Sequence, residues 1–474
     1  MESTPKRVSK ACDACKLRKV KCNGRERCQQ CSHLGLHCIY SASTKPRAQG
    51  KRGRIILEYK NKTSITKTTS PPVLVASPTQ PEYDQAFFLD LIPDYMEMIY
   101  SFHPVITENE LRKYIKAMDT DQEAKSFIYA FGGCTLNLTR YGDKRTEDVL
   151  QTIKTLLKYS IETLKPPYAN FRSSVLRAMQ SLFLHNCLMS MQASDAAFYY
   201  MRDAISAIEL LRVDDKELMA TLPPPERARR QRLHWQAFIH ERFVAILDYR
   251  QAISRPLECL PEDDPTIPLS VQTGFNQIIK LFRLVDTDFL KNWLGSQSPG
   301  SVPSAWIEAK SRELEGEDVD YSEGHSLALL TTMQRADLAI TREWLRTLVW
   351  RLAMSQALLS TRPSKDCLTL LFPIRLSQNL RQQVTGMSRD DIEVHGSSIV
   401  QKLFEITDTI ADVLIHVPAP TFEETALRIE DYLFILDFIL KNPNLDQTRK
   451  GILLEKLKRL QAIFPERLSA YIPF

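Results

Sequence analysis

Residues 12–38 read CDACKLRKVKCNGRERCQQCSHLGLHC, and the six cysteines in this stretch decide how the N-terminal part of the chain folds. Its two halves, residues 12–22 and 28–38, have the same spacing, C-x2-C-x6-C. The stretch is therefore an internal duplication. Six thiolates in two matched halves suit a small metal cluster, and the candidate metal ligands are Cys12, Cys15, Cys22, Cys28, Cys31 and Cys38.

Zinc suits this spacing because a C-x2-C turn places two thiolates on one tetrahedral ion. A single zinc ion would use the two C-x2-C pairs and leave Cys22 and Cys38 without a role. Two zinc ions use all six cysteines if two of them bridge. The pseudo-symmetry selects the first cysteine of each half, Cys12 and Cys28, as the bridges. The sequence therefore predicts two Zn²⁺ ions in a cluster whose net negative charge needs basic residues around it.

Three disulfides, an iron–sulfur or metal-storage cluster, and zinc ligation by His33 or His37 are the alternatives. The N-terminus lacks the apolar stretch of a secretory signal, so we expect a reducing compartment, where cysteines are metal ligands more often than disulfides. The four cysteines outside the cluster are predicted to be buried core thiols: Cys134, Cys187, Cys259 and Cys367.

Basic residues are concentrated in the first half of the duplication. Four of the six residues between Cys15 and Cys22 are Lys16, Arg18, Lys19 and Lys21, whereas residues 32–37 hold no Lys or Arg. Residues 1–62 contain 16 Lys and Arg against 4 Asp and Glu, and the rest of the chain contains 46 against 53. A basic arm on a mildly acidic body indicates a local contact with a polyanion, most simply double-stranded DNA.

The stretch ACDACKLRKVKC, residues 11–22, resembles the fungal binuclear zinc-cluster (Zn2Cys6) transcription factors. The resemblance implies a nuclear protein whose first cysteine helix enters the major groove and reads a CGG triplet, partly through Arg18 and Lys19. Lys16 and Lys21 are then expected to contact phosphates or to shield the cluster. Most members have a proline before the fourth cysteine. Here the loop reads NGRER, and we expect its turn to use Asn23-Gly24.

Residues 41–82 have the composition of a flexible linker, with a basic run, a Thr/Ser tract and four prolines between residues 71 and 81. Lys51, Arg52 and Arg54 are candidates for nuclear import or phosphate contact, with a solvated basic linker as the alternative. The short apolar stretch at 55–57 shows no heptad repeat, so we expect a monomer on DNA or a homodimer formed elsewhere. No apolar run approaches 18 residues, and no membrane partner is expected.

The remainder, residues 83–474, is predicted to be a large all-α domain, so the fold class is mostly α, with a zinc module at 9–40. Apolar residues recur at helical spacing, as in Leu176, Met179, Phe183 and Cys187. Long helical segments are expected at 195–212, 231–249, 326–360, 403–414 and 425–441, with prolines at 223–225 and 261–268 separating helices.

The segment HWQAFIHERF, residues 234–243, resembles the helical fungal-specific regulatory domain, particularly that of regulators of amylolytic or maltose genes. The resemblance implies control of a metabolic gene set, with a small-molecule effector and the transcription machinery as partners. Glu241 and Arg242, inside an apolar helix, should pair with neighbouring helices. The acidic tract 313–320 is either an activation segment or an exposed loop.

The leading hypothesis is a nuclear, sequence-specific DNA-binding regulator of RNA polymerase II genes that is not an enzyme. No G-x-S-x-G, phosphate-binding loop or H-E-x-x-H is present, and no catalytic residue is assigned. One alternative is a helical enzyme or metabolite-binding protein with an appended structural zinc module. Another is an adaptor that uses zinc only for folding.

Overall fold

The computed structural model describes residues 11–17, 22–33, 37–40, 83–164, 172–295, 300–316, 328–359, 366–417, 419 and 421–468. The chain divides into two compact units, Met1–Gln80 and Pro81–Phe474. Within the described residues all regular structure is helical, with no β-strand, which confirms the predicted fold class. None of the described helices is both long and apolar enough to cross a membrane.

The first unit contains two short helices, α1 (Asp13–Leu17) and α2 (Gln29–His33). The described helices of the second unit are α4 (Gln85–Leu89), α5 (Ile92–Asp94), η1 (Tyr95–Ile99), α6 (Glu108–Ala117), α7 (Gln122–Thr139), η2 (Gly142–Lys144), α8 (Glu147–Thr163), α9 (Val175–Ser190), α10 (Ser194–Leu210), α11 (Lys216–Ala220), α12 (Pro224–Leu247), α13 (Leu269–Arg283), α14 (Thr287–Gly295), α15 (Ser304–Glu315), α17 (Thr332–Ser355), η3 (Asp366–Leu368), α18 (Phe372–Val384), α19 (Arg389–Glu393), α20 (Gly396–His416), α21 (Phe422–Leu440), α22 (Gln447–Ile463) and α23 (Pro465–Leu468).

The long helices expected from apolar periodicity are present, with boundaries that differ by a few residues. The two proline-rich segments also separate helices as predicted, the first α11 from α12 and the second α12 from α13. Pro224 and Pro225 additionally form the first turn of α12, where proline's missing N–H breaks no helical hydrogen bond. Helix α12 therefore begins earlier than its apolar pattern indicates.

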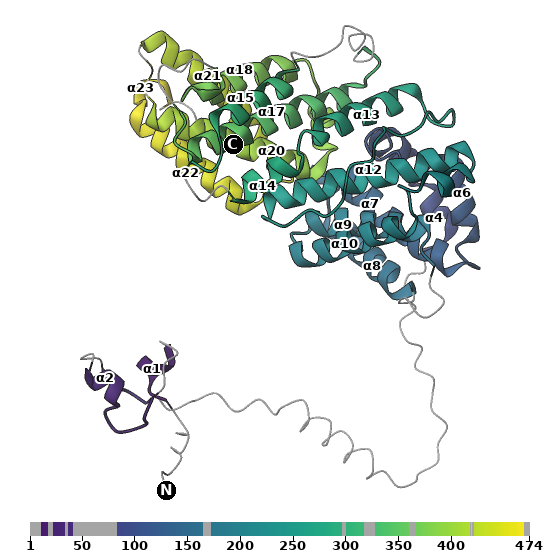
Figure 1. Cartoon of the computed structure of the whole chain (residues 1–474), viewed down its shortest axis with the longest axis horizontal. Helices are drawn as coiled ribbons and strands as arrows, with labels where there is room; N and C mark the ends of the chain where they lie inside the picture. Colours follow the sequence, from purple (N-terminus) through teal and green to yellow (C-terminus); the bar gives the residue numbers. More distant parts are fainter. Residues whose placement is uncertain are drawn as a thin grey trace. The chain divides into compact units, whose positions relative to one another are not determined.

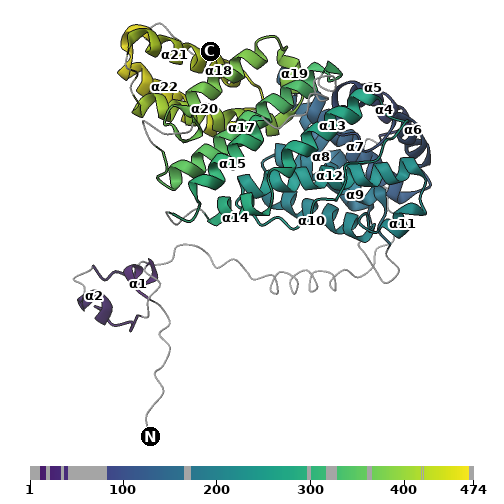
Figure 2. The ribbon, with the colours of Figure 1, turned by 45° about the horizontal axis from the view of Figure 1, so that its top comes forward.

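Helix α12 lies between two hydrophobic cores of the second unit. One core is formed mainly by α4 to α10 and includes Leu233 and Ala237 of α12. The other is formed mainly by α13 to α23 and includes Trp235 and Phe238 of the same helix. Figures 1 and 2 show α12 between the blue helices of residues 83–210 and the green and yellow helices that follow. A helix that is buried on several sides in this way fixes how the two halves pack.

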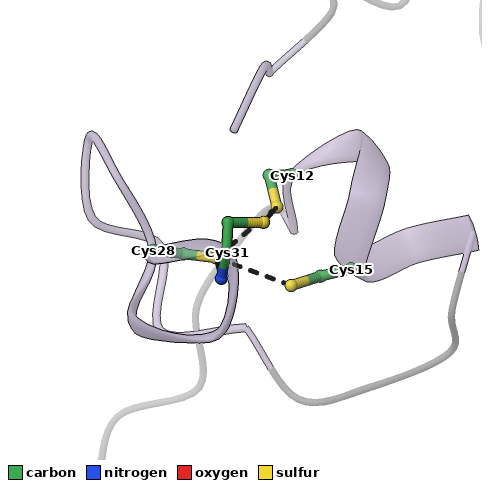
Figure 3. Close-up of side chains that lie close together, drawn as sticks. All are labelled: Cys12, Cys15, Cys28 and Cys31. Atoms are coloured by element: carbon green, nitrogen blue, oxygen red, sulfur yellow. Dashed lines mark hydrogen bonds between the residues drawn. The ribbon is translucent and has the colours of Figure 1, made fainter. Parts of the chain in front are cut away.

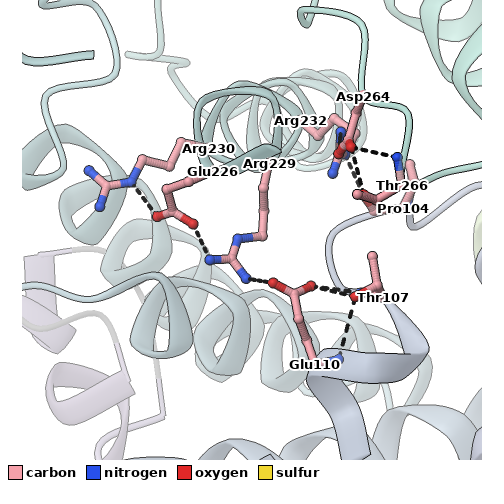
Figure 4. Close-up of polar contacts among 9 residues, drawn as sticks. All are labelled: Pro104, Thr107, Glu110, Glu226, Arg229, Arg230, Arg232, Asp264 and Thr266. Atoms are coloured by element: carbon pink, nitrogen blue, oxygen red, sulfur yellow. Dashed lines mark hydrogen bonds and ion pairs between the residues drawn. The ribbon is translucent and has the colours of Figure 1, made fainter. Parts of the chain in front are cut away.

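Charged side chains anchor the first half of α12 to its neighbours (Figure 4). Arg229 forms ion pairs with Glu110 of α6 and with Glu226 one turn earlier in α12. Arg232 forms a fully buried ion pair with Asp264, at 2.9 Å, in the segment that leads to α13. Buried charges are stable only when they are paired in this manner, so these contacts fix the position of α12 relative to both segments.

The second half of α12 carries the two charged residues singled out from the sequence. Glu241 accepts a hydrogen bond from Arg202 of α10 at 2.6 Å and another from the backbone N–H of Ser254 at 2.8 Å, so its predicted pairing with a neighbouring helix is confirmed. Arg242 differs from the prediction, because it donates to the backbone carbonyls of Val285 and Ser254, both at 3.0 Å. Burial lowers the pKa of Arg242 to about 10.

Two sequence expectations need correction. Cys134, Cys187 and Cys367 are buried as predicted, but Cys259 is exposed. It lies in the irregular segment between α12 and α13, whose backbone is anchored by Trp235 Nε1 donating to the carbonyl of Cys259 at 3.3 Å. The acidic tract is not simply an exposed loop, since its first residues end α15 and Leu314 is buried. Residues 317–320 lie outside the described part.

Gln334 connects α17 to both cores and requires a glycine beside it. Its side chain completes a capping box with Thr331 and donates to the carbonyls of Ser101 and Ser270, each at 3.1 Å. A Cβ on Gly274 would lie 2.3 Å from Gln334 Nε2. Because three hydrogen bonds hold this amide in place, it has no room to move away.

We predict that Gly274→Ala lowers the free energy of unfolding by about 1–3 kcal/mol, as overpacking does in a dense core. Gly451→Ala is the matched control, because nothing lies within 4 Å of its Cβ position in α22. That change should be neutral or stabilising. Thermal and chemical denaturation followed by circular dichroism measures both, and equal effects of the two substitutions would contradict the packing argument.

Candidate metal centre and nucleic-acid interface

The two halves of the cysteine duplication fold in the same way. Helices α1 and α2 each begin directly after the first cysteine of a half, so each C-x2-C spans one helical turn. The N–H of Lys16 donates to the carbonyl of Cys12 and the N–H of Ser32 to that of Cys28, both at 2.9 Å. These contacts occupy equivalent positions, as the repeated spacing predicts.

The four cysteines of the two C-x2-C pairs converge on one point (Figure 3). Their sulfur atoms all lie within 4.8 Å of one another, and all four side chains are buried. Cys12 Sγ lies 3.7 Å from Cys28 Sγ and 3.6 Å from Cys31 Sγ, and Cys15 Sγ lies 3.5 Å from Cys28 Sγ. Zn–S bonds of ~2.3 Å in a tetrahedron place sulfurs about 3.8 Å apart. The arrangement therefore fits shared zinc ions.

Cys22 and Cys38 lie beside these four, with polar hydrogens directed at their sulfurs. The N–H of Gly24 donates to Cys22 Sγ at 3.5 Å, and the N–H of Cys28 donates to Cys38 Sγ at 3.2 Å. Hydrogen bonds from backbone groups, that of Cys12 first and that of Gly24 next, lower the pKa of Cys22, and the thiolate is the form that binds metal. All six cysteines thus have the surroundings of metal ligands, and none forms a disulfide.

The charge of the cluster needs cations. Burial raises the pKa of Cys15 to about 12, whereas the N–H of Cys31, 3.3 Å away, is the largest of the effects that lower the pKa of Cys28 to about 6. Neighbouring thiolates repel one another, so protein groups alone do not ionise all of them. Two Zn²⁺ ions supply the missing positive charge and hold the two halves together.

The loop between the halves forms its turn at Asn23-Gly24 without the usual proline, as expected. Gly24 has a φ of +69°, a conformation that favours glycine. Asn23 Oδ1 accepts from the N–H of Gln29 at 3.2 Å and so connects the turn to α2. Tyr40, which sequence reasoning missed, donates its hydroxyl to the carbonyl of Arg25 at 2.8 Å and lies 3.6 Å from Cys22 Sγ.

The structure locates one of the four predicted DNA-contacting residues. Lys16 is exposed near the end of α1. The other predicted contact residues lie outside the described part of the chain: Arg18, Lys19, Lys21, Lys51, Arg52 and Arg54. His33 and His37 are exposed, and neither belongs to the group of four cysteines whose sulfur atoms converge.

Residues 10–47 match the model of the fungal Zn(2)-Cys(6) binuclear cluster domain. The chain carries this domain. The predicted binuclear zinc-cluster domain and its two zinc ions are thereby confirmed, so the chain carries the DNA-binding domain of a Zn2Cys6 transcription regulator. The relatives described next are regulatory proteins as well.

The similarity extends beyond the cluster domain. The maltose fermentation regulatory protein MAL13 of Saccharomyces cerevisiae is 21% identical over 423 residues, which cover 86% of this chain and 84% of the relative. The probable sucrose utilization protein SUC1 of Candida albicans is 20% identical, covering 85% and 79%. The respiratory transcription factor ZNF1 of S. cerevisiae is 19% identical, covering 86% and 85%. Each match is far longer than the cluster domain, so these similarities include most of the second unit.

We predict that Tyr40→Phe weakens zinc retention about tenfold, because groups that orient metal ligands typically contribute 10–100-fold to metal affinity. The substitution keeps the ring but removes the hydroxyl that joins Arg25 to Cys22. Ile39→Ala is the control, since the side chain of Ile39 is 58% exposed. Zinc release to a colorimetric chelator measures both variants. Loss of zinc from Ile39→Ala but not from Tyr40→Phe would contradict the assignment.

Proposed function

We propose that this protein is a nuclear transcription factor that binds CGG-type DNA sites and regulates RNA polymerase II genes of sugar metabolism. The observation that carries the proposal is the convergence of two C-x2-C pairs within 4.8 Å inside a matched zinc-cluster domain. The names of the relatives, which refer to maltose and sucrose, support the choice of gene set.

Six cysteines are the ligands in this proposal: Cys12, Cys15, Cys22, Cys28, Cys31 and Cys38. Cys12 and Cys28 bridge the two zinc ions. Three sulfur contacts of 3.7, 3.6 and 3.5 Å support this choice, since each involves Cys12 or Cys28 and joins the two halves of the duplication. The cluster fixes α1 as the element presented to the DNA, with zinc in a structural role.

DNA recognition is assigned to α1 and the basic residues that follow it. Arg18 and Lys19 read guanine edges in the major groove, because their side chains suit the O6 and N7 acceptors. Lys16 and Lys21 neutralise phosphates. Lys51, Arg52 and Arg54 serve nuclear import or contact the backbone beside the site. We assign the zinc module to residues 9–40, the linker to 41–82 and the regulatory domain to 83–474, which contacts the transcription machinery.

We predict that Cys15→Ala abolishes gel-shift binding to a CGG-containing duplex, because one zinc ion loses a ligand and the cluster no longer holds α1. Cys259→Ala is the matched control: the same substitution at an exposed cysteine outside the cluster should leave binding unchanged. A wild-type protein that binds no CGG duplex at low salt would refute the proposed specificity. Equal binding by Cys15→Ala would refute the role of zinc.

Two further substitutions separate base reading from phosphate contact. Arg18→Ala should cost about 1–3 kcal/mol on a CGG site and relax specificity there. Lys16→Ala should weaken binding to all duplexes alike and reduce the slope of log K against log salt by about 0.9. Binding measured at several salt concentrations, on CGG and scrambled duplexes, gives both quantities. An adaptor that uses zinc only for folding would show neither effect.

A further inference from the structure

A cavity of about 120 Å³ lies inside the second unit, at the seam between the two hydrophobic cores. Its walls come from segments far apart in the sequence, from Phe102 before α6 to Lys402 in α20, with α9, α12, α13 and α17 between them. Sequence reasoning missed this site. The sequence holds one related observation, the number of its histidines. Four of the nine histidines line this cavity: His103, His185, His240 and His395.

The histidines provide neutral hydrogen-bonding groups. Burial lowers the pKa of His103 to about 3 and that of His185 to about 4, and it lowers the pKa values of His240 and His395 as well. His185 Nδ1 donates to the carbonyl of Ala197 at 2.9 Å, so its Nε2 is an acceptor. The imidazoles are therefore uncharged at neutral pH.

The charged groups of the cavity cancel. Lys402 forms a 3.0 Å ion pair with Asp337 and donates to Thr341 Oγ1 at 2.6 Å. This pairing holds the pKa of Asp337 at about 2, against the effect of burial, so the carboxylate stays ionised. Because one lysine and one aspartate balance each other beside neutral imidazoles, the cavity favours an uncharged occupant.

One amide in the wall has an unused hydrogen-bonding atom. Gln236 of α12 is 4% exposed, and its Nε2 donates to His240 Nε2 at 2.9 Å. Its Oε1 is buried and has no hydrogen-bond partner among the described residues. A buried carbonyl left unpaired costs about 1–3 kcal/mol, so this atom indicates an occupant that carries a donor.

The rest of the wall is apolar, with Phe243, Phe275 and Phe282 among its residues. Metal binding is a poor alternative. Among the described residues, the cluster cysteines are the one group that brings three or more possible ligand atoms within 4.8 Å. A cavity of about 150 Å³ accommodates the six carbons of benzene, so this one of about 120 Å³ accommodates roughly five heavy atoms. Neutral hydrogen-bonding groups around an apolar wall suit a molecule with hydroxyls and a carbon skeleton.

We propose that this cavity binds a small neutral polyol, and that the polyol is an effector of the regulatory domain. The effector role rests on the regulatory function proposed above. A bound polyol contacts residues of both cores, so it stabilises their packing by an amount that rises with the polyol concentration.

Saturation-transfer difference NMR on the full, zinc-loaded chain tests the binding, with ethylene glycol and glycerol as neutral probes. Glycolate serves as a charged probe of similar size. We expect signals from at least one neutral probe and none from glycolate. Signals from glycolate, or no signal from either neutral probe, would overturn the proposal.

Substitutions place the binding in the cavity. Gln236→Met, which keeps the volume but removes the amide, should weaken binding at least tenfold. Gln401→Met is the matched control, because Gln401 Oε1 is also buried and unpaired but lies outside the cavity. It should bind normally. Ser397→Leu, which fills the cavity, should abolish the signal while the thermal transition confirms a folded protein. Binding that survives both Gln236→Met and Ser397→Leu would overturn the site.

The Cys15→Ala variant separates this proposal from the proposed function. It should lose DNA binding and keep the polyol signal, because its substitution lies in the first unit and the cavity in the second. If polyol binding holds but the wild-type chain binds no DNA, the proposed function fails and the cavity assignment stands. If DNA binding holds and no polyol binds, the cavity assignment alone fails.

Discussion

Helix α12 is buried on several sides although it carries charged and polar side chains. The packing of the second unit depends on how these side chains are accommodated. Each of these groups must find a partner, because an unpaired buried charge costs several kcal/mol. Arg232 pairs with Asp264, Glu241 with Arg202, and Arg242 with backbone carbonyls. These contacts extend in different directions to neighbouring segments. The need for partners therefore determines how the helices on either side of α12 are placed.

The first unit meets the opposite constraint. It is too short to bury an apolar core, and the centre of its described part consists of cysteines with Tyr40 and two alanines around them. Metal–thiolate bonds take the place of hydrophobic burial, so folding and metal binding are one process. This also explains why the two halves of the duplication have different roles, one in metal binding alone and one in metal and DNA binding. Both are needed to complete the cluster, but basic residues follow the C-x2-C pair in the first half alone.

The zinc module could be predicted in detail because its ligands lie within 27 residues and their spacing is itself the geometric information. The helices were predictable from apolar periodicity. The start of α12 was not, because residues 224–232 are rich in proline and arginine and their burial depends on ion pairs with distant segments. The exposure of Cys259 was missed because cysteine is usually buried, although its neighbours Glu258 and Pro261 are typical of an exposed connecting segment.

The cavity could not be predicted, because residues from 102 to 402 meet there and no local pattern connects them. The types of residue that line the cavity can nevertheless be interpreted from the free-energy cost of burying polar groups. Replacing a buried ion pair by apolar residues of similar volume is often neutral or stabilising. Lys402 and Asp337, three buried imidazoles with the partly buried one of His240, and the unpaired carbonyl of Gln236 are therefore costly features for a site that only needs to join two cores. Apolar residues between the two cores would stabilise their packing more, whereas polar residues make this packing depend on the molecule that the cavity binds.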